Sequence, residues 1–411
     1  MKFEEIHENL THIKSYELLG KLPDPFLFND GTRVSKTEDW AKRREEIYET
    51  AINLQFGTQP PAPEFLEVDP LYIPGKGAPN MYRIRTGTRQ NPVVFTMTVF
   101  KACSSVTAPV VISGDLCFGN IYDKEFIHTF TDNDIHFVLF NRTEIAPDVA
   151  GYNLKGLGSS ETGEYELGRK VLDQLETKNC GGQLKEAYPE YTFGTVGAWA
   201  WGYSRCVDAL EILGIADMNL ITFTGLSRGG KACALAGALD ERALIVNPSA
   251  TCSGAYSSYR INIEADEPDG HFRMSEPLSN IFHHFPSWMG TEMEQYIGHE
   301  EDLPFDSHFL KAMIAPRILF VSEAANDIMA NPVGSWQTTE AAAEVFKFLD
   351  CEENLYWYYR RGTHGQNIED ITQLVNIVMH VRNGEPLNDR FFKLPFPKMA
   401  PAYDWKCPEK E

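Results

Sequence analysis

The chain has 411 residues, of which 43% are hydrophobic and 12% aromatic, and this composition is typical of a globular protein with a large core. The formal net charge of -21 argues against nucleic acid and against an anionic membrane as partners, because both repel an acidic surface. None of the eight cysteines forms a C-x-x-C pair, which excludes zinc-finger spacing.

The amino-terminal sequence shows no secretory signal pattern, since no basic segment followed by an apolar one begins at Met1. No apolar run approaches the ~18–20 residues that a membrane span requires. We therefore expect a soluble cytoplasmic protein, or a secreted one if the sequence has been trimmed. The sequence leaves the oligomeric state open.

Residues 1–65 are expected to form a helical extension packed on the core, and residues 66–411 the main domain. The tetrapeptide at 35–38, Ser-Lys-Thr-Glu, has the form of a capping box, and the pattern over 40–54 predicts a helix with one apolar face. The prolines within 60–63 end this region as an extended connector.

Apolar runs then predict the first strands of a sheet, at residues 81–85, 92–100, 110–113 and 135–140. His136 falls inside the last of these runs. We expect it to be a core or hydrogen-bonded histidine.

Two long insertions interrupt the predicted domain. Residues 141–193 are polar and glycine-rich, which favours an irregular surface insertion with one helix near 164–176. Residues 249–305 are rich in aromatic side chains and follow the carboxyl end of a strand, where α/β proteins place their sites. We expect this second insertion to form a cap over a binding site.

The second half of the chain alternates strand-length apolar runs with helical patterns. This order predicts an α/β fold, a doubly wound and mostly parallel sheet with helices on both faces. Strands are expected at 220–224, 243–246, 318–321 and 355–359, and helices at 196–213, 231–239, 340–348 and 368–381.

The strand at 220–224 runs into Gly225-Leu-Ser-Arg-Gly229 and then into a helix, and this strand–turn–helix context makes a G-x-S-x-G pentapeptide informative. Glycines flank the serine because the turn is too tight for bulky neighbours. The serine hydroxyl would stand above the sheet edge, facing helix N–H groups that stabilise negative charge. Ser227 is therefore the predicted nucleophile.

An acid and a histidine follow the two last strands. Asp327 comes soon after 318–321, and His364 comes directly after 355–359. The order Ser227, Asp327, His364 is that of the α/β-hydrolase fold. His364 would serve as general base and then as general acid, while Asp327 would fix its tautomer. Glu323, which is nearer the strand end, is the alternative acid.

No metal and no other cofactor is expected. His283 and His284 are adjacent in the sequence, a spacing that suits neither helix nor strand ligation of one ion. His299 and His308 occur singly.

Several segments around these residues resemble the glucuronoyl esterases, carbohydrate esterase family 15, in its bacterial form. The resemblance runs from about residue 23 to about residue 365. Its most specific part is Gly225-Leu-Ser-Arg-Gly-Gly-Lys231 followed by Ala236-Gly-Ala-Leu-Asp-Glu-Arg242. Further matches are Asp24-Pro-Phe-Leu-Phe-Asn-Asp-Gly31, Trp40-Ala-Lys-Arg-Arg44, Ala198-Trp-Ala-Trp-Gly202, Leu303-Pro-Phe-Asp-Ser-His308 and Ile314-Ala-Pro-Arg317.

The resemblance implies roles for four more residues. Arg228 would help to stabilise the oxyanion, where a cation is favourable beside developing negative charge. Lys231 and the cap residue Glu276 would contact a uronic sugar. Trp288 matches a family aromatic and would either line the sugar site or belong to the core of the cap.

The sequence also departs from the fungal members of that family. Ala250 occupies the position of their acid, so the acid here would come from the later strand, as Asp327. Leu226 and Gly365 occupy the positions of two fungal cysteines, so that disulfide cannot form. Ile328 and Met329 stand where the family often has a tryptophan.

The sequence thus predicts a serine carboxylic-ester hydrolase that resembles glucuronoyl esterases and cleaves an ester of glucuronate, 4-O-methyl-glucuronate or a related sugar acid. The partner would be a small-molecule or oligosaccharide ester. One alternative is an esterase acting on other small sugar esters, such as acetylated xylo-oligosaccharides. Another is a non-catalytic relative that binds carbohydrate.

Overall fold

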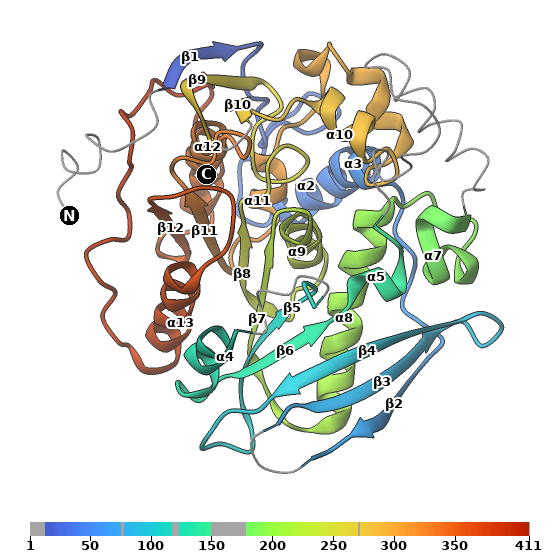
Figure 1. The fold of residues 1–411 in the computed structure, drawn as a ribbon. Helices are drawn as coiled ribbons and strands as arrows, with labels where there is room; N and C mark the ends of the chain where they lie inside the picture. The colour runs from blue at the N-terminus through green and yellow to red at the C-terminus, as the bar shows by residue number, and fades with distance from the viewer. Residues whose placement is uncertain (1–12, 75–77, 117–122, 149–177, 270–271, 411) are drawn as a thin grey trace.

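The computed structural model describes residues 13–74, 78–116, 123–148, 178–269 and 272–410. Within them, a sheet of nine strands runs in the order β12-β11-β8-β7-β5-β6-β4-β3-β2 (Figure 1). The strands are β2 Phe65–Tyr72, β3 Asn80–Gly87, β4 Pro92–Phe100, β5 Ala108–Ser113, β6 His136–Phe140, β7 Ala216–Leu226, β8 Ala243–Ser249, β11 Ile318–Ala324 and β12 Leu355–Arg360.

Six neighbouring strands, from β12 to β6, pair in parallel, while β4, β3 and β2 add an antiparallel edge. Every residue of β5, β6 and β11 is buried, as parallel strands covered on both faces require. The predicted fold class is confirmed: the chain has the α/β-hydrolase fold.

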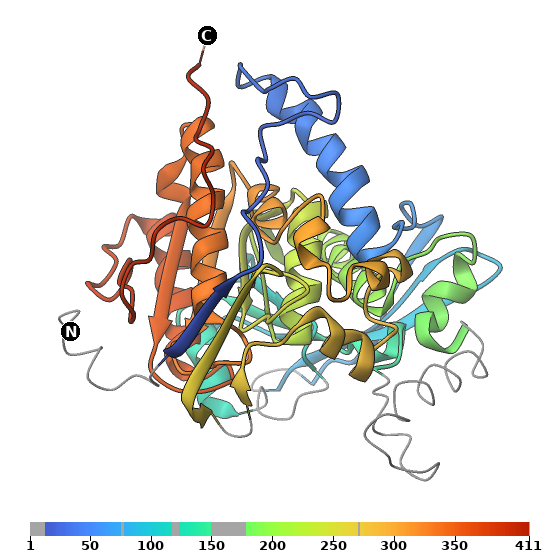
Figure 2. The same cartoon turned by 90° about the horizontal axis from the view of Figure 1, so that it is seen from above.

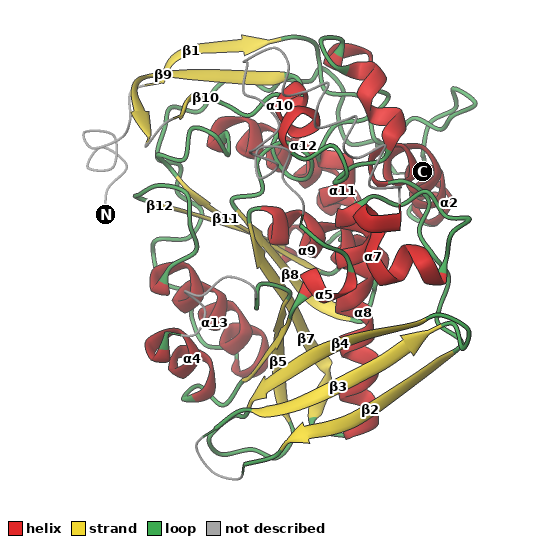
Figure 3. Cartoon of the chain, turned by 45° about the vertical axis from the view of Figure 1, so that its right-hand side comes forward, coloured by secondary structure: helices red, strands yellow, loops and turns green. Residues whose placement is uncertain are grey.

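Helices cover both faces of this sheet (Figure 3). On one face lie α8 Thr195–Leu213, α9 Arg228–Leu239 and α12 Pro332–Phe348. On the other lie α4 Lys124–Thr131 and α13 Ile368–Asn383, which pack against β6 and β12. Among the described helices, none combines the length and the apolar character that crossing a membrane would take.

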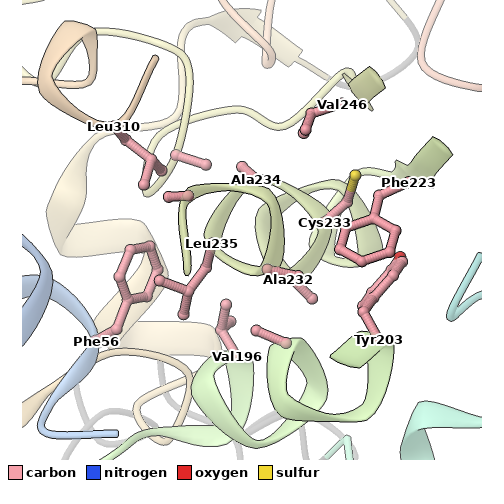
Figure 4. Close-up of a cluster of buried hydrophobic side chains, with 14 of the residues drawn as sticks. Phe56, Val196, Tyr203, Phe223, Ala232, Cys233, Ala234, Leu235, Val246 and Leu310 are labelled. Carbon is pink, nitrogen blue, oxygen red and sulfur yellow. The ribbon is translucent and has the colours of Figure 1, made fainter. Parts of the chain in front are cut away.

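The larger core cluster joins the central strands to α8 and α9 (Figure 4). Phe223 of β7 and Val246 of β8 face Tyr203 of α8 and the small side chains of α9. The alanines along α9 let this helix lie close to the sheet, so that its first residues are held rigidly at the edge of β7. That rigidity positions the turn between β7 and α9.

The predicted strands and helices of the sheet are confirmed, with shifts at their ends. The largest shift is in α12, which begins at Pro332 and not near residue 340, because the Asn331 side chain accepts a hydrogen bond from the Gly334 N–H and caps the helix. His136 is buried as expected, and its Nδ1 accepts the Ala102 N–H at 2.8 Å.

Trp40 and Ile47 of the amino-terminal region belong to the larger core cluster, and the helical segment around them differs from the predicted one. The helix predicted at 40–54 consists of α2 Asp39–Ile47, a π-helical turn Tyr48–Ile52 and α3 Asn53–Phe56. The predicted capping box is wrong, because Glu38 makes no side-chain cap. Instead, the Asp39 carboxylate accepts the backbone N–H groups of Ser35 and Lys36 at 3.1 and 3.0 Å.

A second sheet that the sequence did not predict joins the amino-terminal region to the cap. Strand β1, Ile13–Leu18, pairs antiparallel with β9, Ile261–Asp269, and β9 pairs with β10, Phe272–Met274 (Figure 2). The division of the chain at residue 65 stays a prediction.

Both predicted insertions contain helices. The first holds α5 Arg142–Ile145 and α7 Lys178–Ala187, while the helix expected near 164–176 lies outside the described residues. The second holds β9, β10, α10 Leu278–His284 and short 3-10 turns. It lies at the carboxyl ends of the parallel strands, above the start of α9 (Figure 1).

Candidate active site

The turn between β7 and α9 holds Ser227 in a strained backbone conformation, with φ 55 and ψ -120. A positive φ in a residue other than glycine costs about 1–3 kcal/mol and persists only where the surroundings enforce it. Here the Ser227 N–H donates to the Ser249 carbonyl at 2.9 Å, and the Ser227 carbonyl accepts the Lys231 N–H at 2.9 Å. The serine is thus fixed at the N-terminus of α9.

A buried ion pair is hydrogen-bonded to the backbone of this turn. Asp115, which follows β5, pairs with Arg142 of α5, and both side chains are buried. The second carboxylate oxygen of Asp115 accepts the Leu226 N–H at 2.8 Å, one residue before the serine. Desolvation raises the pKa of Asp115, while the Arg142 charge and the Leu226 N–H counteract that rise.

The close approach of the Asp115 carboxylate to the turn requires a glycine at position 229. A Cβ at position 229 would lie 1.9 Å from Asp115 Oδ1, well inside any possible contact distance. Gly229 therefore allows the Asp115 carboxylate to approach the backbone closely, and it also allows the turn to be sharp.

The structure brings Asp327 and His364 together. Asp327 Oδ2 lies 2.7 Å from His364 Nδ1, and the other carboxylate oxygen accepts the Ala330 N–H at 3.1 Å. The Asp327 side chain is 1% exposed, whereas that of His364 is 31% exposed. This arrangement holds Nδ1 of the imidazole from the buried side and leaves Nε2 for a group in the cavity.

The alternative acid, Glu323, lies elsewhere. Its carboxyl is buried and accepts the Ser335 hydroxyl at 3.0 Å, and no hydrogen bond to His364 is found within the described residues. Desolvation, together with the nearby Asp327 charge, raises the pKa of Glu323 to about 8. A carboxyl whose pKa is raised in this way, and whose described hydrogen bond goes to Ser335, is poorly suited to stabilising the His364 imidazolium.

The predicted site residues surround one cavity of about 380 Å³. It is lined by Ser227, Arg228, Lys231, Cys252, Glu276, Asn280, His284, Phe285, Trp288, Met329 and His364. All the candidates except Asp327, which lies behind His364, therefore face the same space. A more open groove of about 700 Å³ adjoins the cavity and shares Glu276 and Asn280 with it.

Arg228 is held at one wall of the cavity. Its Nη1 lies 3.0 Å from Asp148 Oδ2, and its guanidinium carbon lies 4.6 and 4.8 Å from the ring centroids of Phe285 and Trp288. Those two rings stack at 3.8 Å with an interplanar angle of 7°. A cation beside the serine is thus kept in place by a carboxylate and two aromatic rings.

Lys231 and Glu276 form a buried charge pair at another wall, with Nζ and Oε2 3.6 Å apart. The ammonium group also donates to the carbonyl of Thr251 and, at 2.5 Å, to that of Ser253. An ammonium has three donors. Among the described residues, the carboxylate nearest to the third donor is that of Glu276, and its 3.6 Å distance is beyond hydrogen-bond length. A hydroxyl group of a ligand can therefore bridge the two charges.

Two important residues were missed by the sequence analysis. Asp115 and Asp148 carry no recognisable motif, and they reach the site from loops 112 and 79 positions before Ser227, respectively, so only the folded chain brings them there. The Trp288 indole, whose role was left open, donates to Asp148 Oδ1 at 3.2 Å and also lines the cavity.

The chain is similar to known esterases in both sequence and structure. The family model described as "Glucuronyl esterase, fungi" matches residues 168–350. A 4-O-methyl-glucuronoyl methylesterase 1 from Wolfiporia cocos is 26% identical over 351 residues, which cover 84% of this chain and 76% of that relative.

Solved structures extend the similarity to nearly the whole chain. A carbohydrate esterase family 15 glucuronoyl esterase from Caldicellulosiruptor kristjansonii matches with a TM-score of 0.73 and 24% identity, covering 97% of this chain and 98% of that one. A mutant glucuronoyl esterase from Sporotrichum thermophile, in complex with methyl 4-O-methyl-beta-D-glucopyranuronate, matches with a TM-score of 0.66, 20% identity and 93% coverage of both chains.

Proposed function

We propose that this chain, a relative of the glucuronoyl esterases of carbohydrate esterase family 15, is a serine carboxylic-ester hydrolase acting on esters of glucuronate or 4-O-methyl-glucuronate. One observation carries the proposal. A single cavity of about 380 Å³ joins the strained Ser227 and the acid-bound His364 to the buried Lys231–Glu276 pair. The first two residues supply ester chemistry, and the charge pair supplies polar contacts for a sugar.

The proposed reaction begins with proton transfer from the Ser227 hydroxyl to Nε2 of His364 as the serine oxygen attacks the ester carbonyl. The negative charge that develops on the carbonyl oxygen is stabilised by Arg228 and by the N–H groups at the start of α9. His364 then gives its proton to the departing alcohol, which leaves a glucuronoyl ester on Ser227. Water, activated by His364, hydrolyses this ester. Asp327 holds the imidazole tautomer throughout.

Sugar recognition is assigned to Lys231, Glu276 and Trp288. A hydroxyl that bridges the Lys231 ammonium and the Glu276 carboxylate would donate to one charge and accept from the other. The Trp288 ring offers an apolar surface beside this pair. Such a wall suits a hydroxylated ring better than a long acyl chain.

We propose that the acid arrangement is of the bacterial type. Ala250 is buried and carries no acid, while Asp327, after β11, accepts the hydrogen bond from His364.

The cytoplasmic location expected from the sequence stays a prediction.

The test is the hydrolysis of benzyl glucuronate and of p-nitrophenyl acetate by the wild type and by Ser227→Ala. We expect the wild type to hydrolyse the glucuronate ester and the serine variant to lose that activity. Turnover of p-nitrophenyl acetate alone would contradict the assignment of a uronate ester as substrate. It would leave the assignment of Ser227 as nucleophile intact. Activity retained by Ser227→Ala would overturn the nucleophile assignment itself.

A further inference from the structure

Asp148 connects two residues of the cavity that are 60 positions apart in the sequence. One of its carboxylate oxygens lies 3.0 Å from Arg228 Nη1, and the other accepts the Trp288 indole N–H at 3.2 Å. The Asp148 side chain is 16% exposed and that of Arg228 is 24% exposed. Within the described part of the chain, Asp148 is the carboxylate that pairs with this arginine.

The backbone that carries Asp148 is itself anchored. The Trp199 indole N–H donates to the carbonyl of Ala146, two residues earlier, at 2.8 Å. Glu144 accepts the Thr96 N–H of β4 at 2.6 Å. Arg142 forms the ion pair with Asp115 beneath the serine turn. One short segment, 142–148, is thus linked to the turn twice: Arg142 pairs with Asp115, which accepts the Leu226 N–H, and Asp148 pairs with Arg228.

The pairing leaves part of the Arg228 guanidinium available. Nη1 is engaged by Asp148, whereas Nε is buried without a hydrogen-bond partner among the described residues. The side chain as a whole stays 24% exposed, so a ligand can reach the part of the guanidinium that faces the cavity. Arg228 directly follows Ser227 and lines the same cavity. A guanidinium N–H on that side can meet the carbonyl oxygen of an ester that Ser227 attacks.

We propose that Asp148 is a positioning residue for the reaction: it orients the Arg228 guanidinium toward the oxyanion and, through Trp288, fixes the adjoining wall of the cavity. Asp148 touches no reacting atom and acts through Arg228. This proposal rests on the serine-hydrolase part of the proposed function and not on the identity of the sugar.

A double-mutant cycle separates this role from a purely structural one. We would measure kcat for p-nitrophenyl acetate and for benzyl glucuronate with Asp148→Ala, Arg228→Ala and the double variant. Because a misdirected oxyanion donor costs roughly 10–100-fold in rate, Asp148→Ala should lower kcat by about that factor. In the Arg228→Ala background the same change should alter kcat by less than about twofold.

Two further variants sharpen the test. Asp148→Asn keeps one oxygen acceptor for the Trp288 indole but removes the charge, so it should still lower kcat, and it replaces Asp148→Ala in the cycle if that variant fails to fold. Asp208→Asn is the control, because Asp208 pairs with Arg205 and Arg242 at 2.6 and 2.7 Å away from the cavity. It should leave kcat unchanged.

An equal loss of kcat in both backgrounds, or no loss in either, would overturn the proposal for Asp148. If the wild type hydrolyses neither ester, the proposed function has failed, and the role of Asp148 falls with it. If the wild type hydrolyses p-nitrophenyl acetate alone, the double-mutant cycle is measured with that ester. Only the assignment of the sugar is then lost.

Discussion

Two buried carboxyl groups at the end of β11 have different hydrogen-bond partners. Asp327 accepts from His364 and from a backbone N–H, whereas Glu323 accepts from one hydroxyl, and its Oε2 has no partner among the described residues. Hydrogen bonds favour the ionised form, and desolvation without them favours the neutral form. Asp327 contacts His364 and Glu323 does not contact it among the described residues, so Asp327 is the acid of the proposed triad.

Replacing each acid by its amide tests this distinction. Asp327→Asn should lower kcat for the glucuronate ester by roughly 10³–10⁴-fold, because the amide stabilises the wrong imidazole tautomer. Glu323→Gln changes a side chain whose described hydrogen bond goes to Ser335 and not to His364, so kcat should stay within about threefold of the wild type. A larger loss in Glu323→Gln than in Asp327→Asn would reverse the assignment.

The Lys231–Glu276 pair should distinguish sugar esters from simple ones. Glu276→Gln removes the charge but keeps the shape, and hydrogen bonds to charged groups contribute about 1.5–3 kcal/mol. We expect KM for benzyl glucuronate to rise roughly tenfold or more, with kcat/KM for p-nitrophenyl acetate unchanged. Steady-state kinetics on both esters provides the check, and equal losses on both would contradict a sugar-binding role.

Among single residues, the sequence identifies those site residues that belong to a short local motif. Ser227 and His364 could be predicted because each lies in a short glycine-bounded turn after a strand. Asp115 and Asp148 could not be predicted, since their function arises only where separate loops meet. The same limit applies to Trp288, whose position beside Arg228 depends on how the cap folds.

At the scale of elements, the junction of β7 and α9 depends on Gly229. Gly229→Ala would place a methyl group 1.9 Å from Asp115 Oδ1 and displace the Asp115–Arg142 pair. Disturbing a buried pair costs about 3–5 kcal/mol, so we expect a large loss of both stability and activity. Thermal unfolding and acetate hydrolysis measure the two effects.

Gly214→Ala is the matched control for that substitution. Gly214 ends α8 with φ +62, and a Cβ there would meet nothing within 4 Å. Only the left-handed backbone is strained, at about 1 kcal/mol, so activity should persist. Equal loss of activity in both variants would show that close packing against Asp115 is not the reason for Gly229.

The central strands and helices could be predicted because their apolar runs reflect burial on both faces. The edge strand β2 was missed because all of its residues are exposed or only partly buried, and its sequence includes Pro70. The β1–β9 pairing was missed because it joins segments about 250 residues apart, which no local pattern records. The capping box was predicted wrongly because Asp39, one position after Glu38, accepts the backbone N–H groups of Ser35 and Lys36.

At the scale of the whole molecule, His308 links distant parts of the chain. The His308 imidazole N–H at Nε2 donates to the Pro23 carbonyl at 2.8 Å, and its ring stacks on Trp405 at 5.8 Å. Trp405 in turn donates to the Leu22 carbonyl at 2.8 Å. The amino- and carboxyl-terminal segments are thereby joined across α11, His308–Ala312, although they are far apart in sequence.

This arrangement predicts a pH dependence of stability. Desolvation lowers the pKa of His308 from 6.5 to about 4, so the unfolded chain takes up a proton before the folded one does. Stability should therefore fall as the pH drops from about 6.5 to about 4, by roughly 3 kcal/mol for this group alone.

The check is the free energy of unfolding at pH 4 and at pH 7 for the wild type and for His308→Gln. The variant should lose less stability on acidification than the wild type does. His128→Gln, at an exposed histidine, is the control and should follow the wild type. An unchanged loss in His308→Gln would contradict the assignment of this acid sensitivity to His308.

The covalent intermediate can be detected by mass spectrometry of the enzyme quenched during turnover of benzyl glucuronate. We expect a glucuronoyl group on the peptide that contains Ser227, and no such adduct in Ser227→Ala. Turnover without an adduct on that serine, or an adduct on another residue, would contradict the assignment of Ser227 as nucleophile.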